Sequence, residues 1–264
     1  MSKKMWIKHF SLMFVFFMFN YLNSQDLKLY EKESFVYEND TLNYRILKPL
    51  NYNPNKQYPV HLFLHGSGER GNDNSSQLTH GGKLFLKKEN REKYNSWVIF
   101  PQCSENDRWP SLSSDKWNKS FSTNISKPNK SLGLVIRLMD KFVEKKQVDK
   151  KRIYVSGLSM GGMGTFEILF RRPNMFAAAT PICGNGIPQL AKLYAEKVPL
   201  WIFHGSDDNV VSPKYSLAMA KAIIEAGGSP KMTLYENTGH GSWNNAFAEK
   251  DFLKWIHSKT NNEY

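Results

Sequence analysis

In the middle of the chain stands the segment Ser156-Gly157-Leu158-Ser159-Met160-Gly161-Gly162-Met163. A short apolar run, residues 153–155, precedes it, and apolar residues at helical spacing follow it as far as Pro173. This order predicts a strand, a sharp turn and a helix, with Ser159 at the tip of the turn. Gly157 and Gly161 flank the serine because so tight a turn leaves no room for side chains two residues to either side.

Ser159 is therefore a candidate nucleophile. The start of the following helix would direct its unpaired amides and the positive end of its dipole toward charge that develops beside the serine hydroxyl. The pattern Gly-x-Ser-x-Gly is weak by itself, and its place between a strand and a helix is what favours a nucleophile. The alternative is an ordinary loop between strand and helix, in which glycines allow close packing.

Length and composition favour one large α/β domain. The chain has 264 residues, of which 41% are hydrophobic and seven are tryptophan, so it can form a substantial core. The formal net charge is +12, but the lysines are scattered and no basic run is interleaved with aromatic residues. We interpret this charge as a solvated basic surface and expect no nucleic-acid binding.

The first 24 residues have the pattern of an export signal. Three lysines accompany an apolar stretch, residues 10–22, which is too short to cross a bilayer comfortably as a helix. We expect cleavage after Ser24, a single catalytic domain over residues 25–264, export to the periplasm or medium, and no stable membrane insertion after cleavage. An uncleaved anchor is the alternative.

Strands and helices are expected to alternate along the rest of the chain. The expected strands are residues 34–37, 42–47, 60–64, 97–100, 153–155, 177–183, 200–203 and 231–235. The expected helices begin at Ser131, Met160, Gln189, Ser212 and Ala246, the last of them running to Ser258. This order predicts an α/β fold with a mostly parallel sheet, helices on both faces and an antiparallel hairpin at its start. Residues 104–130 form an unusually long connection, of the kind that is often functional.

The two cysteines, Cys103 and Cys183, end strands that we do not expect to be neighbours. A disulfide requires the two Cα atoms to lie within about 7 Å. We therefore expect two free, buried thiols.

A serine hydroxyl needs a base to become nucleophilic, and the best candidate among the seven histidines is His240. It lies in an irregular, glycine-flanked loop after the last strand, which can bring an imidazole over the sheet edge. His65 and His204 each stand in a His-Gly pair at a strand end, where we expect the ring to brace the adjacent loop. The other histidines have no comparable positional argument; they are His9, His61, His80 and His257.

The base in turn needs an acid that fixes its tautomer and stabilises the imidazolium. Asp207 and Asp208 follow the penultimate strand, and their positions alone do not separate them. Serine, aspartate and histidine then occur in the chain order expected for an α/β-hydrolase.

Attack on an ester creates an oxyanion, which must be met by preset hydrogen-bond donors. One expected donor is the backbone amide of Met160, directly after the serine. The second is expected in the glycine-rich segment after the strand of residues 60–64, with the Ser67 amide as first choice and the Gly66 amide as second.

These motifs together resemble secreted α/β-hydrolases of the carboxylesterase/phospholipase-like type, close to feruloyl esterases and polyhydroxybutyrate depolymerases. The resemblance covers about residues 34–258. It rests on Leu64-His65-Gly66-Ser67-Gly68-Glu69-Arg70-Gly71, Pro101-Gln102-Cys103 with Trp109, Gly157-Leu158-Ser159-Met160-Gly161-Gly162, His204-Gly205-Ser206-Asp207-Asp208 and Gly239-His240-Gly241-Ser242-Trp243. What the resemblance implies is a triad of Ser159, Asp208 and His240, because the family's acid stands four residues after the histidine at the strand end.

The expected function is that of an exported serine esterase acting on a small-molecule or oligosaccharide ester. Trp109, Trp117 and Trp243, with Phe121, could line a rim that stacks on sugar or aryl groups, although anchoring of loops to the core would explain them equally well. Related chains are often labelled predicted peptidases of the prolyl-oligopeptidase kind, so a serine peptidase is the alternative. A non-catalytic binding protein is a third hypothesis. We expect no cofactor and no metal, since no residues have metal-ligand spacing.

Overall fold

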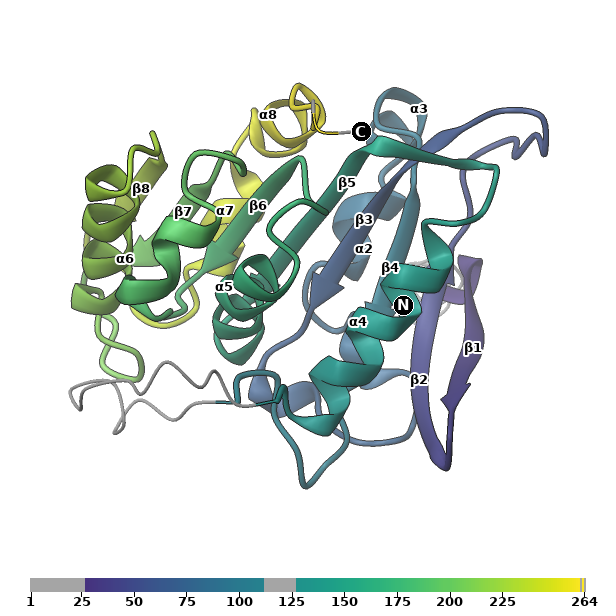
Figure 1. Ribbon diagram of the computed structural model, residues 1–264, viewed down its shortest axis with the longest axis horizontal. Helices are drawn as coiled ribbons and strands as arrows, with labels where there is room; N and C mark the ends of the chain where they lie inside the picture. Colours follow the sequence, from purple (N-terminus) through teal and green to yellow (C-terminus); the bar gives the residue numbers. More distant parts are fainter. Residues whose placement is uncertain (1–26, 112–126, 262, 264) are drawn as a thin grey trace, which may run out of the picture.

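The structure is a computed structural model, and it describes residues 27–111, 127–261 and 263. Eight strands form one sheet (Figure 1). The strands are β1 (Tyr30–Tyr37), β2 (Asp40–Leu47), β3 (Tyr58–Leu64), β4 (Trp97–Pro101), β5 (Val148–Leu158), β6 (Ala178–Ile182), β7 (Trp201–Gly205) and β8 (Lys231–Tyr235).

The order of the strands in the sheet is β1-β2-β4-β3-β5-β6-β7-β8. Strands β1 and β2 form an antiparallel hairpin, β2 pairs antiparallel with β4, and every other neighbouring pair is parallel. The mostly parallel sheet with an antiparallel start is thus confirmed. The parallel strands β3 to β8 end at one edge of the sheet, and the candidate site residues all follow these ends.

Helices cover both faces of the sheet, as expected. The α-helices are α2 (Gly82–Leu86), α3 (Lys88–Lys93), α4 (Lys130–Phe142), α5 (Met160–Arg171), α6 (Lys214–Glu225), α7 (Trp243–Ala248) and α8 (Phe252–His257). Short 3-10 turns are η1 (Leu27–Leu29), η2 (Ser67–Glu69), η3 (Ser76–Leu78) and η5 (Pro188–Leu193). In Figure 1, α4 and α5 lie in front of the sheet, whereas α2 and α7 lie behind it.

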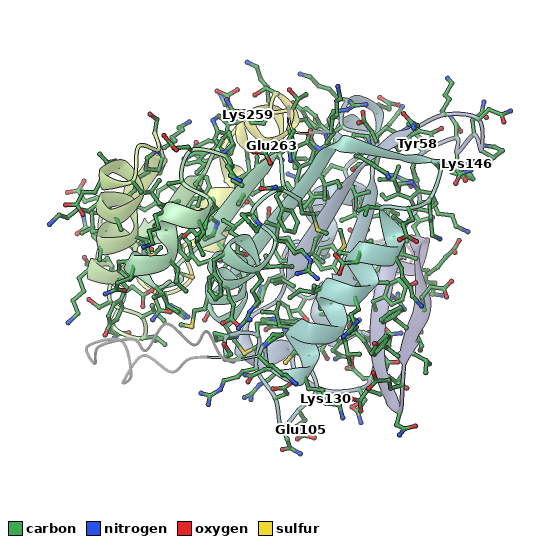
Figure 2. All side chains as sticks on the ribbon, in the orientation of Figure 1. Tyr58, Glu105, Lys130, Lys146, Lys259 and Glu263 are labelled. Carbon is green, nitrogen blue, oxygen red and sulfur yellow. The ribbon has the colours of Figure 1, made fainter. Side chains whose placement is uncertain are left out.

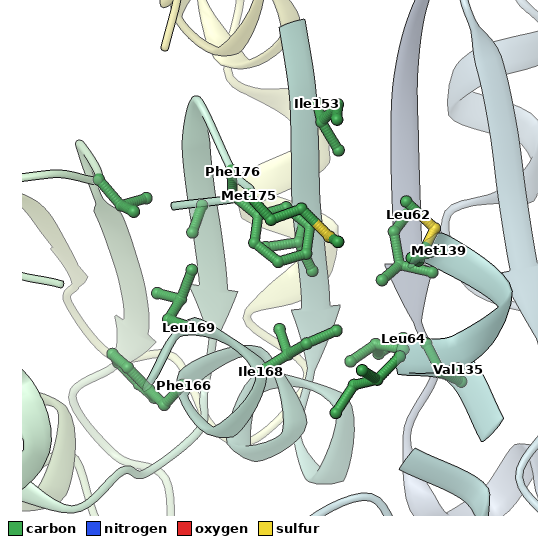
Figure 3. Close-up of a cluster of buried hydrophobic side chains, with 14 of the residues drawn as sticks. Leu62, Leu64, Val135, Met139, Ile153, Phe166, Ile168, Leu169, Met175 and Phe176 are labelled. Carbon is green, nitrogen blue, oxygen red and sulfur yellow. The ribbon is translucent and has the colours of Figure 1, made fainter. Parts of the chain in front are cut away.

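Two apolar clusters fill the space between the sheet and its helices. One cluster joins the sheet to α4, α5 and α6, and the other joins it to α2, α7 and α8. Figure 3 shows part of the first, in which Leu62 and Leu64 of β3 approach Val135 and Met139 of α4. Strand β3 is buried along its whole length, which explains why its sequence reads as an apolar run rather than an alternating one.

Four expected helices differ in detail from those observed, and one of them is α6, which begins at Lys214 instead of Ser212. Helix α4 begins at Lys130, one residue before the expected cap Ser131, and Asp107 reaches from the preceding loop to accept a hydrogen bond from the Ser131 amide at 2.7 Å. The helix expected from Gln189 is the 3-10 turn η5. The long final helix is two helices, α7 and α8, because Glu249 adopts an extended ψ of 121° between them.

The two cysteines are free and buried, as expected. Charged side chains surround the molecule, and Lys130, Lys146 and Lys259 lie far apart on its periphery (Figure 2). Within the described ranges, no helix combines the length and apolar character that crossing a membrane requires. The expected signal, residues 1–24, lies outside the described residues.

Candidate active site

Ser159 lies between β5 and α5 in a strained backbone conformation, with φ of 53° and ψ of −119°. The residues two positions before and after it must be glycine. A Cβ on Gly157 would lie 2.2 Å from the Gly161 carbonyl oxygen, and one on Gly161 would lie 1.9 Å from the carbonyl oxygen of Leu64. The positive φ of Ser159 is unfavourable for a residue other than glycine, and it persists because the surrounding structure imposes it. Such strain is common at functional sites, which makes the Ser159 hydroxyl a candidate reactive group.

The structure brings Ser159, His240 and Asp208 together from the ends of β5, β8 and β7. His240 Nε2 lies 2.9 Å from Ser159 Oγ, and His240 Nδ1 lies 2.7 Å from Asp208 Oδ2. Since a carboxylate can only accept, Nδ1 carries the proton and donates it to Asp208. The unprotonated Nε2 then accepts the hydroxyl hydrogen of Ser159, which is the arrangement a base requires.

Asp208, rather than its neighbour Asp207, reaches the histidine. Asp208 is buried, and its Oδ1 accepts the amides of Val210 and Val211, each at 2.9 Å. Burial alone would raise the pKa of Asp208, but the hydrogen bonds from His240 and from these two amides outweigh it and hold the pKa below its ordinary value. Asp207 is exposed and accepts a hydrogen bond from the neighbouring Ser206 hydroxyl.

His204 is a second histidine in contact with the buried acid. Its Nε2 lies 3.2 Å from Asp208 Oδ2 and 2.8 Å from the Val211 carbonyl oxygen, while Nδ1 lies 2.7 Å from Ser216 Oγ. Burial lowers the pKa of His204, so the ring is neutral, and its proton must be on Nε2 because that nitrogen faces two acceptors. His204 therefore braces the loop that carries the acid. The contact with Asp208 was not predicted.

His65 braces the glycine-rich loop after β3 in a similar way. Nδ1 donates to the Gly66 carbonyl oxygen at 2.6 Å, and Nε2 accepts the Cys103 amide at 2.9 Å. Burial lowers the pKa of His65 to about 4, which keeps the ring neutral and able to make both bonds. The loop lies close to the serine, since a Cβ on Gly66 would be 3.7 Å from Ser159 Cβ. Ser67 follows Gly66 and is exposed.

The three tryptophans of the expected rim have different positions. Trp109 is fully buried, and its Nε1 donates to the His65 carbonyl oxygen at 2.9 Å, so it anchors the loop instead of lining an open rim. Trp243 is partly buried and lies edge-to-face against His240, with ring centroids 5.5 Å apart. Trp117 lies outside the described residues.

Two polar residues beside the site, Glu69 and His80, were given no role in the sequence analysis. Glu69 lies at the end of η2, and its Oε1 is 3.6 Å from His80 Nε2. The His80 ring in turn lies 5.1 Å from the ring of Trp243. The only signal in the sequence was the place of Glu69 in the segment that follows β3, because His80 and Trp243 come from distant parts of the chain.

One group of described residues has the donor atoms for a metal ion. The ligand atoms of Cys183, Asp208 and His240 lie within 4.8 Å of one another. However, Asp208 and His240 already hydrogen-bond to each other, and burial raises the pKa of the Cys183 thiol to about 12. A thiol with that pKa does not readily supply the thiolate that a metal needs. The group is better suited to proton transfer than to metal binding.

Comparison with known proteins identifies the family of the chain. The phospholipase/carboxylesterase family matches residues 52–257, a range that contains all the site residues described above. The chain belongs to this family. The resemblance seen in the sequence and the α/β-hydrolase fold are thereby confirmed, and both activities in the family's name are hydrolyses of esters.

Individual relatives agree with the family. The crystal structure of a thermostable esterase is 31% identical, with a TM-score of 0.81 over 90% of this chain and 64% of that protein. A bifunctional acetylxylan esterase/xylanase of Neocallimastix patriciarum is 33% identical over 78 residues, which are 30% of this chain and 12% of that protein. A ferulic acid esterase of Anaeromyces mucronatus shares the fold, with a TM-score of 0.64 at 15% identity over 87% of this chain and 90% of that one. The chain thus spans less than two thirds of the first two proteins.

Proposed function

We propose that this protein is a serine carboxylic-ester hydrolase that works through an acyl-enzyme. The observation that supports this most is the continuous hydrogen-bonded arrangement from Ser159 Oγ to His240 Nε2, and from His240 Nδ1 to Asp208 Oδ2. Nε2 takes the hydroxyl proton while Oγ attacks the ester carbonyl carbon. The bond from that carbon to the alcohol oxygen then breaks, and the imidazolium gives its proton to the departing oxygen.

Hydrolysis of the acyl-enzyme repeats these steps with water. His240 takes a proton from a water molecule, whose oxygen attacks the acyl carbon. The bond from that carbon to Oγ then breaks, and the proton on Nε2 returns to Oγ as the carboxylic acid leaves. Asp208 holds the imidazole in the tautomer that both halves need and stabilises the imidazolium that each half forms.

We assign the negative oxygen of the tetrahedral intermediate to two backbone amides. Met160 is the first residue of α5, and the first amides of a helix have no partner within it. The second donor is the amide of Ser67, with that of Gly66 as the alternative. The close approach of Gly66 to the Ser159 side chain supports a donor in this loop.

For the substrate we propose a carbohydrate or aryl ester. The partial likeness to an acetylxylan esterase supports this, as does the edge-to-face position of Trp243 against His240, from which an indole can present apolar surface to a sugar or aryl ring. Trp117 stays part of the proposed rim, whereas Trp109 is withdrawn from it because its side chain is buried.

We also propose that the protein is exported and that residues 1–24 are removed. Basic residues before a short apolar stretch support this. Expression of the full chain in a secreting host, followed by N-terminal sequencing of the protein outside the cytoplasm, should give a chain that begins at Gln25. A protein retained in cells with Met1 intact would refute this part of the proposal.

The catalytic proposal is tested with a fluorophosphonate probe and Ser159→Ala. The wild type should be labelled, and the variant should not be labelled although it folds with the same circular dichroism spectrum. Folded wild-type protein that resists labelling would instead support a binding protein. Comparison of short aryl esters with peptide anilides then distinguishes an esterase from a peptidase, and we expect the esters to be hydrolysed at the higher kcat/KM.

A further inference from the structure

Glu69 has a buried carboxylate oxygen that lacks a hydrogen-bond donor. Its side chain is only 12% exposed, and Oε2 receives no hydrogen bond from the described residues. Burying a carboxylate oxygen without a donor costs free energy, because water no longer solvates its charge. Such an arrangement therefore needs an explanation at the site where it occurs.

The carboxylate lies next to the proposed nucleophile. A Cβ placed on Gly66 would be 3.0 Å from Glu69 Oε2 and 3.7 Å from Ser159 Cβ. A side chain at position 66 would thus meet both groups, and its absence lets them approach the same point. Because attack joins the acyl carbon of an ester to Ser159 Oγ, the acyl group is held in the same region.

Among the described residues, the basic side chains near Glu69 do not donate a hydrogen bond to its carboxylate. His80 Nε2 is 3.6 Å from Oε1, which is beyond hydrogen-bond distance, and its side chain is 33% exposed. Arg70 is adjacent in the chain, but its guanidinium donates to the carbonyl oxygens of Ser67 and Asp107. Asp208 differs from Glu69 in this respect, because His240 and two amides satisfy its oxygens.

We propose that Glu69 sets the charge preference of the site. Its negative field disfavours esters with a carboxylate near the scissile bond and favours neutral or cationic acyl groups. A field of this kind is strong because the carboxylate that produces it is largely shielded from water. The inference rests on the proposed esterase function. It also gives the site a local preference opposite to that of the whole chain, whose net charge of +12 attracts anions at long range.

The test uses three esters with one leaving group: p-nitrophenyl butyrate, p-nitrophenyl hemisuccinate and p-nitrophenyl 4-(trimethylammonio)butyrate. The ratio of kcat/KM between a charged ester and the butyrate isolates the effect of charge. In Glu69→Gln the hemisuccinate ratio should rise about tenfold and the cationic ratio should fall by a similar factor. Two charges about 10 Å apart at an effective dielectric constant of about 20 interact to roughly this extent.

Three controls separate this effect from others. Glu69→Asp keeps the charge and should keep both ratios close to those of the wild type. Glu105→Gln removes a charge from an exposed side chain at the periphery (Figure 2) and should leave both ratios within about twofold. Measurement at 0.5 M NaCl screens long-range attraction, whereas the contribution of a buried group should persist.

Ratios that are the same in Glu69→Gln and in the wild type would overturn the proposal. So would an equal change in Glu105→Gln. If folded wild-type protein hydrolyses none of the three esters, it is the esterase function that fails, and the two failures are therefore distinguishable.

Discussion

Asp208→Asn removes one negative charge from the candidate active site while hardly changing the size of the side chain. The Asp208 oxygen that faces Val210 and Val211 accepts two backbone amides, each at 2.9 Å. An asparagine must keep its carbonyl oxygen there, since its NH₂ group would otherwise face those two donors. The NH₂ group then points toward Nδ1 of His240.

This orientation reverses the tautomer of the histidine. Facing a donor, Nδ1 must present its lone pair, and the single proton of the neutral ring moves to Nε2. A protonated Nε2 cannot accept the proton of Ser159, which lies 2.9 Å away. We expect kcat to fall about 10⁴-fold, which corresponds to roughly 5.5 kcal/mol of transition-state stabilisation. The new NH₂ group also faces the proton on His204 Nε2, so unfolding should become easier by about 1–3 kcal/mol.

The assay is the initial rate of p-nitrophenyl acetate hydrolysis from pH 6 to 9, with thermal unfolding of each variant measured in parallel. Asp207→Asn is the matched control, because it removes the same charge from the adjacent, exposed residue. Its kcat should stay within about threefold of the wild type. The reasoning is refuted if folded Asp208→Asn keeps more than one-hundredth of the wild-type kcat, or if Asp207→Asn is the more damaging change.

Three further predictions follow from the packing and the electrostatics. Gly161→Ala forces a Cβ against the Leu64 carbonyl oxygen, so we expect a loss of more than about 2 kcal/mol in urea unfolding together with lost activity, and an active variant of native stability would contradict this. Burial lowers the pKa of His61 well below its ordinary value and that of His257 to about 3, so both rings stay neutral when folded, whereas the unfolded chain binds protons below about pH 6.5. The free energy of unfolding should therefore be unaffected by these two groups above pH 7 and should fall below pH 6.5. His257→Gln should reduce the loss of unfolding free energy between pH 7 and pH 5 by about 2 kcal/mol. If this variant loses as much unfolding free energy as the wild type, the His257 ring does titrate in the folded protein. Dialysis against EDTA should leave ester hydrolysis unchanged, whereas activity that disappears and returns with added zinc would show that a metal takes part.

The turn around Ser159 could be predicted because its causes are local. The glycines at two residues to either side, the apolar run before them and the helical spacing after them are all visible within a short window of sequence. The structure shows in addition which atoms occupy the space that a side chain on those glycines would need. The Leu64 carbonyl oxygen that approaches Gly161 belongs to a strand almost a hundred residues earlier, which no local pattern reveals.

The choice between Asp207 and Asp208 could not be made from position alone. Adjacent residues in a turn point in different directions, and which of them points inward depends on the turn itself. Here the amides of Val210 and Val211 capture one oxygen of Asp208 and thereby turn its other oxygen toward His240. These contacts need the folded loop, and only the resemblance to a family had favoured Asp208 over Asp207 beforehand.

Trp109 illustrates why the sequence alone could not separate a substrate-binding tryptophan from one that anchors a loop. A tryptophan among polar residues in a long connection can stack on a ligand or anchor the connection, and the sequence is the same in both cases. The structure separates them because Trp109 finds a hydrogen-bond acceptor in the His65 carbonyl oxygen and a space next to Gly164. The cap of α4 was missed for a similar reason, since Asp107 comes from outside the helix.

The contact between Gly161 and the end of β3 has a consequence for protein engineering. Strand β3 leads into the glycine-rich segment, and Gly161 lies in the first turn of α5, so a shift of either element displaces the other. The segment after β3 therefore cannot be exchanged for that of another enzyme without disturbing the start of α5. Such a chimaera should keep its activity only if the donor sequence brings its own helix start, or if the carbonyl group of Leu64 keeps its place to within a few tenths of an ångström.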